Sequence, residues 1–317
     1  LRMVLPEHAE RSLQSSKAWM PAHEWRALGL RLLGEADLER LIARGGRPIC
    51  RARLFGGLDV TVGDKTLAES DWTKRKARLL FAILVSERGR DVARERILDH
   101  LWPELDDERA RNNFYVTWSA MKSALGTDEP KGPSPYVQSS RGRCRILSNA
   151  VRSDIDEFEE ALEAARAADV EGDLDVSIIA YQRLATVYRG DLLPGDVYDD
   201  WFSVARDRYR SDFVDAMLRL VDRLLERDDP YEALVYARRG LQVDSLREDL
   251  YQAALRCQIT AGQRSGAIET YIACRTQLSE ELGLDPSAET VALYQQILVM
   301  EECPRRDNFG LPEKTDA

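Results

Sequence analysis

The stretch from Glu108 to Leu125, ERARNNFYVTWSAMKSAL, decides how the first half of the chain is interpreted. With an advance of about 100° per residue, its apolar side chains fall on one side of a helix, namely Ala110, Phe114, Trp118, Met121 and Leu125. The opposite side carries small or polar residues, namely Arg109, Asn112, Val116, Ser119, Ala120 and Ser123. A helix that enters the major groove of DNA needs such a surface, because small side chains allow close approach and a few donors reach base edges. The stretch therefore predicts an amphipathic recognition helix.

The segments around this helix have the order of a winged helix. Residues 49–68 alternate apolar and polar residues between glycines, which predicts short antiparallel strands. A helix is expected from a cap at Thr73 to about Arg88, and a second one over 93–102, stopped by a proline. After the recognition helix, residues 136–147 read as a hairpin with its turn near Arg141-Gly142. Strands, three helices and a hairpin predict an α+β winged-helix domain, in which the hairpin is the wing.

The second half of the chain has a helical pattern and an internal repeat. The segment EALVYA at 232–237 matches GAIETY at 266–271, so that Ala233 and Ala267 are 34 residues apart. This is the period of tetratricopeptide helix pairs, which present a concave surface for partners. The aromatic cluster Tyr198, Trp201 and Phe202 is interpreted as packing between repeats, or as a partner site if a ring is exposed. An all-α repeat domain is therefore expected from about residue 151.

Charge and composition exclude several classes of function. The net charge is −10, but residues 151–317 hold 35 acidic and 19 basic residues, whereas the first 150 residues are mildly basic. This asymmetry indicates a nucleic-acid module joined to a domain of another kind. The five cysteines form no C-x-x-C pair, and we find no phosphate-binding glycine loop, catalytic motif, signal peptide or membrane-spanning run. We therefore expect reduced thiols, no metal, no cofactor, no enzyme activity and a cytoplasmic location.

Five motifs in the same order resemble the Streptomyces antibiotic regulatory protein family, over roughly residues 51–300. The motifs are TKRKARLL at 73–80, VARERILDHLWP at 92–103, ERARNNFYV at 108–116, YRGDLL at 188–193 followed by Asp200-Trp201, and EELGLDPS at 280–287. The resemblance implies a response-regulator-type winged helix followed by a tetratricopeptide-like bacterial transcriptional activator domain. It also implies binding to direct repeats near promoters and recruitment of RNA polymerase, with a pair of subunits suited to tandem repeats.

The chain departs from the family pattern at several positions. The family often has Arg at the places held here by Tyr115, Ala120 and Ser123. It usually has Ser or Thr at the place of Ala93, the expected N-cap of the second helix. This helix therefore lacks its usual cap, unless Asp91 takes that role. Fewer arginines predict weaker DNA binding than is typical of the family. Because Asn pairs with adenine and Val contacts the thymine methyl group, Asn112 and Val116 favour A/T base pairs.

The candidate DNA contacts come from three segments. The recognition helix offers Arg109, Arg111, Asn112, Tyr115, Val116, Ser119 and Lys122, the start of the first helix offers Lys74, Arg75 and Lys76, and the wing offers Arg141 and Arg143. If about six of the cationic residues contact phosphate, the log–log slope of affinity against salt is roughly −5.

We thus expect a mainly α-helical chain with four parts. They are a helical segment and linker over 1–48, the winged helix over 49–150, the repeat domain over 151–300 and a polar tail over 301–317. Because the chain starts with Leu1, residues 1–48 are interpreted as the tail of an upstream domain. The predicted function is a DNA-binding transcriptional regulator, most simply an activator. The alternative is a protein-interaction scaffold whose winged helix has weakened or lost DNA binding.

Overall fold

The computed structural model describes residues 13, 28, 48–126, 133–194 and 200–299. The chain forms two compact units, of which the first comprises Leu1–Glu157 and Asp191–Val204 and the second Phe158–Gly190 and Ala205–Ala317. The expected helical segment over 1–48 and the polar tail over 301–317 lie almost entirely outside the described residues.

The first unit contains a four-stranded sheet. Its strands are β1 (Cys50–Arg53), β2 (Asp59–Val62), β3 (Lys65–Thr66) and β7 (Val151–Ser153), in the order β3-β2-β1-β7. The first three are antiparallel neighbours, as the alternation over 49–68 predicts, whereas β7 pairs in parallel with β1, with Cys50 opposite Val151. Residues 151–153 are expected from the sequence to begin the repeat domain. In the structure they belong to the first unit, because they pair with a strand a hundred residues away.

The three helices of the first unit lie close to where the sequence predicts them. They are α4 (Arg75–Ser86), α5 (Arg94–Leu101) and α6 (Asp107–Ala124). The Asp106 carboxylate caps α6 by accepting a hydrogen bond from the backbone N–H of Arg109 at 2.9 Å. The prediction that Thr73 caps α4 is wrong. The helix begins one residue later, so that Lys74 is its N-cap residue and provides no side-chain hydrogen bond.

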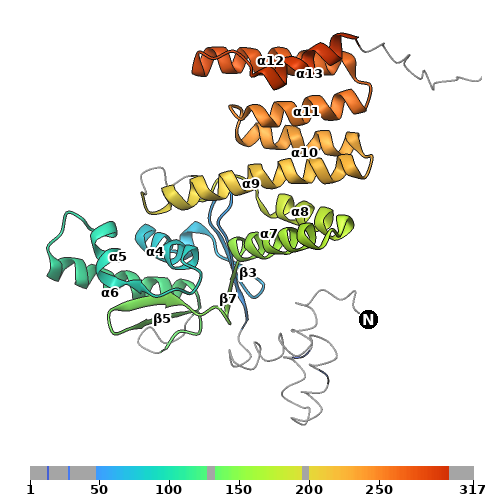
Figure 1. Ribbon diagram of the computed structural model, residues 1–317. Helices are drawn as coiled ribbons and strands as arrows, with labels where there is room; N and C mark the ends of the chain where they lie inside the picture. The colour runs from blue at the N-terminus through green and yellow to red at the C-terminus, as the bar shows by residue number, and fades with distance from the viewer. Residues whose placement is uncertain (1–12, 14–27, 29–47, 127–132, 195–199, 300–317) are drawn as a thin grey trace, which may run out of the picture. The chain divides into compact units, whose positions relative to one another are not determined.

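A three-stranded sheet of the order β4-β6-β5 forms the wing. The hairpin strands are β5 (Val137–Ser140) and β6 (Arg143–Ile146), and β4 (Val92–Ala93) pairs with β6. Arg141 and Gly142 both have positive φ angles, of 49° and 74°, which is the geometry of a type I′ hairpin turn. The predicted hairpin and its turn are therefore confirmed, and the hairpin lies along α6 (Figure 1).

The start of α5 lacks a cap and offers a stabilising substitution. Ala93 is the exposed N-cap residue, with extended backbone angles of −64° and 130°, and no side chain there accepts a hydrogen bond. We expect Ala93→Ser to raise the free energy of unfolding of the first unit by about 1 kcal/mol, because its hydroxyl oxygen can accept an N–H of the first turn. Urea unfolding of the two proteins measures this difference. Ala93→Val, which supplies no acceptor, is the control, and equal stability of the serine variant and wild type would contradict the prediction.

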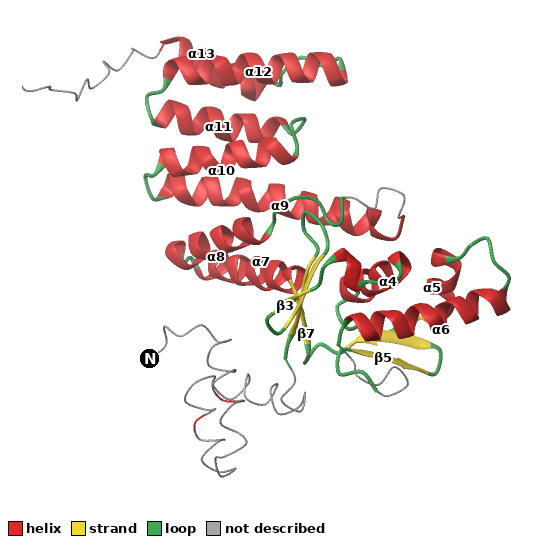
Figure 2. Ribbon diagram, turned by 180° about the vertical axis from the view of Figure 1, so that it is seen from behind, coloured by secondary structure: helices red, strands yellow, loops and turns green. Residues whose placement is uncertain are grey.

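Helices make up the second unit, stacked one on another (Figures 1 and 2). They are α7 (Asp154–Glu171), α8 (Leu174–Val187), α9 (Asp200–Glu226), α10 (Pro230–Val243), α11 (Glu248–Thr260), α12 (Arg264–Leu282) and α13 (Ala288–Val299), of which α7 and α9 begin in the first unit. Ala233 and Ala267 both lie in the first turn of their helices, α10 and α12, and both are completely buried. The 34-residue match thus corresponds to equivalent packing positions, as in a tetratricopeptide-like stack.

Candidate nucleic-acid interface

The buried face of α6 fixes which side chains the helix presents to solvent. Four of the five residues of the predicted apolar side, Ala110, Phe114, Met121 and Leu125, are buried. The fifth, Trp118, is only half-buried and stacks on the ring of Phe114 with a centroid distance of 5.6 Å. The predicted orientation of the helix is therefore confirmed, except that the indole of Trp118 reaches the edge of the core.

Most of the predicted contact residues of α6 are exposed. Arg109, Arg111 and Asn112 are exposed, and so are Tyr115 and Val116, at 57% and 51% of their surface. Ser119 is half-buried one turn further along. Arg109 lies 3.3 Å from the Asp106 carboxylate, but its side chain remains 77% exposed, so this pair is weak in water. The outer face of α6 thus carries hydrogen-bond donors and an exposed valine, which suits a groove of DNA.

Lys122 does not belong to this face, and its assignment as a DNA contact is wrong. Only 6% of Lys122 is exposed, because the last turn of α6 is enclosed, with Met121, Ala124 and Leu125 also buried. Helical periodicity places position 122 on a flank, and periodicity alone does not show which flanks are covered by other elements.

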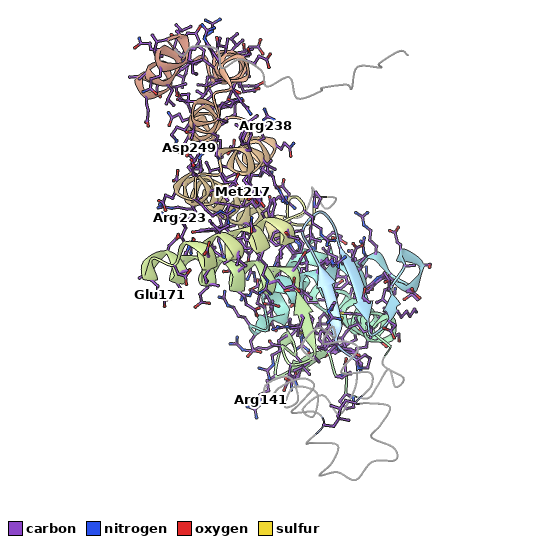
Figure 3. All side chains as sticks on the ribbon, turned by 90° about the vertical axis from the view of Figure 1, so that its right-hand side faces the viewer. Arg141, Glu171, Met217, Arg223, Arg238 and Asp249 are labelled. Carbon is purple, nitrogen blue, oxygen red and sulfur yellow. The ribbon has the colours of Figure 1, made fainter. Side chains whose placement is uncertain are left out.

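The wing adds positive charge beside α6. Arg141 and Arg143 are exposed at the turn and at the first residue of β6, and Figure 3 shows Arg141 reaching away from the ribbon. Arg145 donates two hydrogen bonds, of 3.0 and 2.8 Å, to Gln138 on the opposite strand. Its guanidinium also lies 3.9 Å from Asp91. Arg145 is therefore engaged within the sheet, whereas Arg141 and Arg143 remain available to a ligand.

The basic start of α4 is only partly available. Lys76 is not a free cation, because its ammonium donates to the backbone carbonyl of Leu101, at the end of α5, and lies 5.1 Å from the ring centroid of Trp102. This contact fixes α4 against α5, but 43% of the lysine side chain is exposed, and its role as a DNA contact stays a prediction. Arg75 is exposed and lines a pocket with Gly57 and Leu193, and Lys74 is exposed as well.

Arg94, the first residue of α5, belongs to the candidate interface although no sequence pattern predicts it. Its guanidinium donates a 3.0 Å hydrogen bond to the hydroxyl of Tyr115 on α6, and its backbone N–H donates to the carbonyl of Gly142 in the wing turn at 2.8 Å. Arg94 therefore connects the two elements that offer the predicted contacts. The residue stands in the quoted motif at 92–103, but neither its periodicity nor its local charge distinguishes it from Arg96.

The aromatic cluster near residue 200 is placed differently from the expectation. Trp201, half-buried, lies against α5 of the first unit, with its ring 3.9 Å from the guanidinium of Arg96 and 5.2 Å from the ring of His100. Phe202 is completely buried, and Tyr198 lies outside the described residues. Trp201 thus packs on the winged helix and not between repeats, because the segment Asp191–Val204 belongs to the first unit.

In the described part of the chain, no helix is long and apolar enough to cross a membrane. No group of three or more His, Cys, Asp or Glu side chains gathers there in a way that could hold a metal ion. Four cysteines, Cys50, Cys144, Cys257 and Cys274, are buried and free of disulfides.

The chain combines a winged helix with a tetratricopeptide-like stack, and its curated relatives are regulatory proteins. Residues 153–298 match the model of the bacterial transcriptional activator domain. With the relatives below, this match confirms the resemblance to the Streptomyces antibiotic regulatory protein family.

Three relatives illustrate the similarity. The chain is 23% identical over 245 residues to the transcriptional regulatory protein MoaR1 of Mycobacterium tuberculosis, covering 74% of this chain and 75% of MoaR1. It is 24% identical to the regulatory protein DnrI of Streptomyces peucetius, covering 71% and 84%. A solved structure of Mycobacterium tuberculosis EmbR, in complex with a low affinity phosphopeptide, superposes with a TM-score of 0.66 at 20% identity. That match covers 79% of this chain and 65% of the EmbR chain, and it shows the shared fold alone.

Proposed function

We propose that this chain is a sequence-specific DNA-binding transcriptional regulator that reads promoter DNA with α6 and its wing. One observation carries the proposal: α6 buries one face and exposes Arg111, Asn112 and Val116 on the other, next to a hairpin turn that carries Arg141 and Arg143. Donors and a methyl-bearing side chain on a helix address base edges, whereas arginines on the wing address phosphates or the minor groove. The role is regulation through binding in the cytoplasm, without catalysis.

The affinity for DNA should depend steeply on salt. We expect a log–log slope of affinity against salt of roughly −3.5 to −5, because each neutralised phosphate contributes about −0.9. The lower limit counts Arg109, Arg111, Arg141 and Arg143, and the upper limit adds two contacts at the start of α4. Fluorescence polarisation with a labelled duplex of the native upstream region, over a series of potassium chloride concentrations, measures this slope. Substituting both wing arginines by alanine should reduce it by about two.

The proposed partners follow from the class of protein. We propose that the chain activates transcription by contacting RNA polymerase, that it binds repeated sites, and that two copies occupy a pair of repeats. Residues 151–317 are acidic, and their negative charge repels the DNA phosphates. This supports DNA binding by the winged helix and protein contacts by the acidic part. Footprinting on a promoter with one or two repeats tests the pairing, and protection of a single site at saturation argues against it.

The second candidate function is a protein-interaction scaffold with weak DNA binding. It is favoured by the acidic first turn of α6, where Asp107 and Glu108 follow Asp106, which pairs with Arg109. Negative charge at this end of the helix repels phosphate. Absent binding, or binding that does not change with salt, would support the scaffold and exclude the regulator mechanism.

A further inference from the structure

Beside Tyr115 on α6 lies a positive charge that belongs to another helix, the guanidinium of Arg94 on α5. Tyr115 is more than half exposed on the flank of the outer face of α6, and a phenol carries no charge that could neutralise a phosphate. The guanidinium of Arg94 on α5 lies next to this ring, with its Cζ 5.9 Å from the ring centroid and its Nη1 3.0 Å from the hydroxyl. The tyrosine therefore holds a positive charge beside the recognition helix.

The backbone around Arg94 fixes where this charge lies. Ala93 pairs with Arg143 in the sheet, and the N–H of Arg94 bonds to the Gly142 carbonyl. The guanidinium is thus placed between α6 and the wing, the two elements proposed to follow the DNA. Arg94 also starts α5, whose uncapped amides favour an anion at the same end.

Like Arg141 and Arg143, and unlike the three arginines named next, Arg94 has no carboxylate partner among the described residues. Arg109 is paired with Asp106, Arg145 with Asp91, and Arg96 lies 3.7 Å from Glu87. No acidic side chain of the described residues forms an ion pair with Arg94, and its buried Nε has no hydrogen-bond acceptor there. No carboxylate of the described residues therefore compensates its charge, which is available to an external anion.

We infer that Arg94 contacts a backbone phosphate of the DNA between the base pairs covered by α6 and the groove faced by the wing, and that Tyr115 positions it. The ligand is a phosphodiester oxygen of duplex DNA, recognised without regard to sequence. Tyr115 is in this respect a positioning residue, since its hydroxyl accepts a hydrogen bond from Arg94. The inference rests on the proposed DNA binding and names one of its contacts.

The first test compares Arg94→Gln with Arg96→Gln, a neighbour on the same helix that loses the same charge. Arg94→Gln should weaken binding roughly fivefold at physiological salt, on related and unrelated duplexes alike, and reduce the salt slope by about one. Arg96→Gln should leave the slope unchanged. Tyr115→Phe should keep the slope but weaken binding, because the charge remains while its position is lost. Thermal melting shows that each variant is folded.

A second measurement identifies the phosphate itself. Uncharged methylphosphonates are introduced one at a time along the duplex, and the full chain is titrated with each. The inference predicts one linkage whose neutralisation weakens wild-type binding but leaves the Arg94→Gln protein unaffected. If every linkage affects both proteins equally, or if folded Arg94→Gln retains the wild-type slope, the inference is overturned. If the wild-type protein binds no duplex at all, the proposed function itself is contradicted. This outcome can be told apart from the two outcomes that overturn only the role of Arg94.

Discussion

Replacing Asp154 by alanine should destabilise the first unit by about 3 to 5 kcal/mol, the largest stability effect that we expect from a single substitution. The carboxylate of Asp154, at the start of α7, is buried and accepts hydrogen bonds from the backbone N–H groups of Leu54 and Phe55, at 2.8 to 2.9 Å. Both N–H groups follow strand β1, a hundred residues away in sequence. Alanine would leave two buried donors without acceptors, each of which costs about 1 to 3 kcal/mol.

The matched control for this prediction is Asp173→Ala. Asp173 caps α8, where its exposed carboxylate accepts a single backbone hydrogen bond from Val176 at 3.1 Å. Its loss should cost about 1 kcal/mol. Guanidinium unfolding followed by far-ultraviolet circular dichroism compares the variants, and equal losses for the two substitutions would contradict the anchoring role of Asp154.

Asp154 should also leave a signature in the pH dependence of stability. Burial raises its pKa from 3.8 to about 6, against the lowering effect of the backbone hydrogen bonds from Phe55 and Leu54. A group with a raised pKa binds its proton more tightly in the folded state, so its stabilising contribution is present below pH 3.8 and is lost as the pH rises through 6. The free energy of unfolding of Asp154→Asn should therefore change less between pH 4 and 6 than that of the wild-type protein.

Replacing Asn112 by alanine should lower the affinity for the best A/T-containing site roughly 10- to 100-fold, while affinity for unrelated DNA changes little. Asn112 is exposed at the centre of the outer face of α6, opposite Phe114 and Met121. Its amide can donate to and accept from adenine, so its removal takes away base discrimination and not charge. Binding selection from random duplexes, followed by polarisation titrations, measures both affinities.

The matched control is Asn113→Ala, which removes the same group from the same helix. Asn113 is exposed too, but it lies about 100° around the helix, toward the side of the buried residues. Its substitution should leave site affinity and base preference unchanged. An invariant run of G at the centre of the selected site, or equal effects of the two substitutions, would contradict the proposed orientation of α6.

Much of the architecture could be predicted from the residues alone, because it depends on local periodicity. The apolar spacing of residues 108–125 defines both the extent of α6 and its buried side. Arg141-Gly142 defines the turn of the wing, since a tight hairpin turn needs two positive φ angles. Ala233 and Ala267 reveal the repeat, because small residues recur wherever two helices pack closely.

The candidate site was only partly predictable, because exposure and pairing depend on residues far away in the chain. Lys122 and Lys76 have the composition of DNA contacts, but one is buried and the other binds the end of α5. Arg94 carries no distinguishing pattern, and its importance comes from bonds to Tyr115 and Gly142.

The helices, the wing and the repeat could be predicted from local residue patterns, because a 3.6-residue period and a turn are properties of neighbouring residues. The pairing of β7 and Asp154 with β1 and its end, and the packing of Trp201 on α5, became visible in the folded chain alone. These contacts join segments about a hundred residues apart. The local pattern of either segment does not specify its partner, because many segments could pair with a three-residue strand or donate to a single carboxylate.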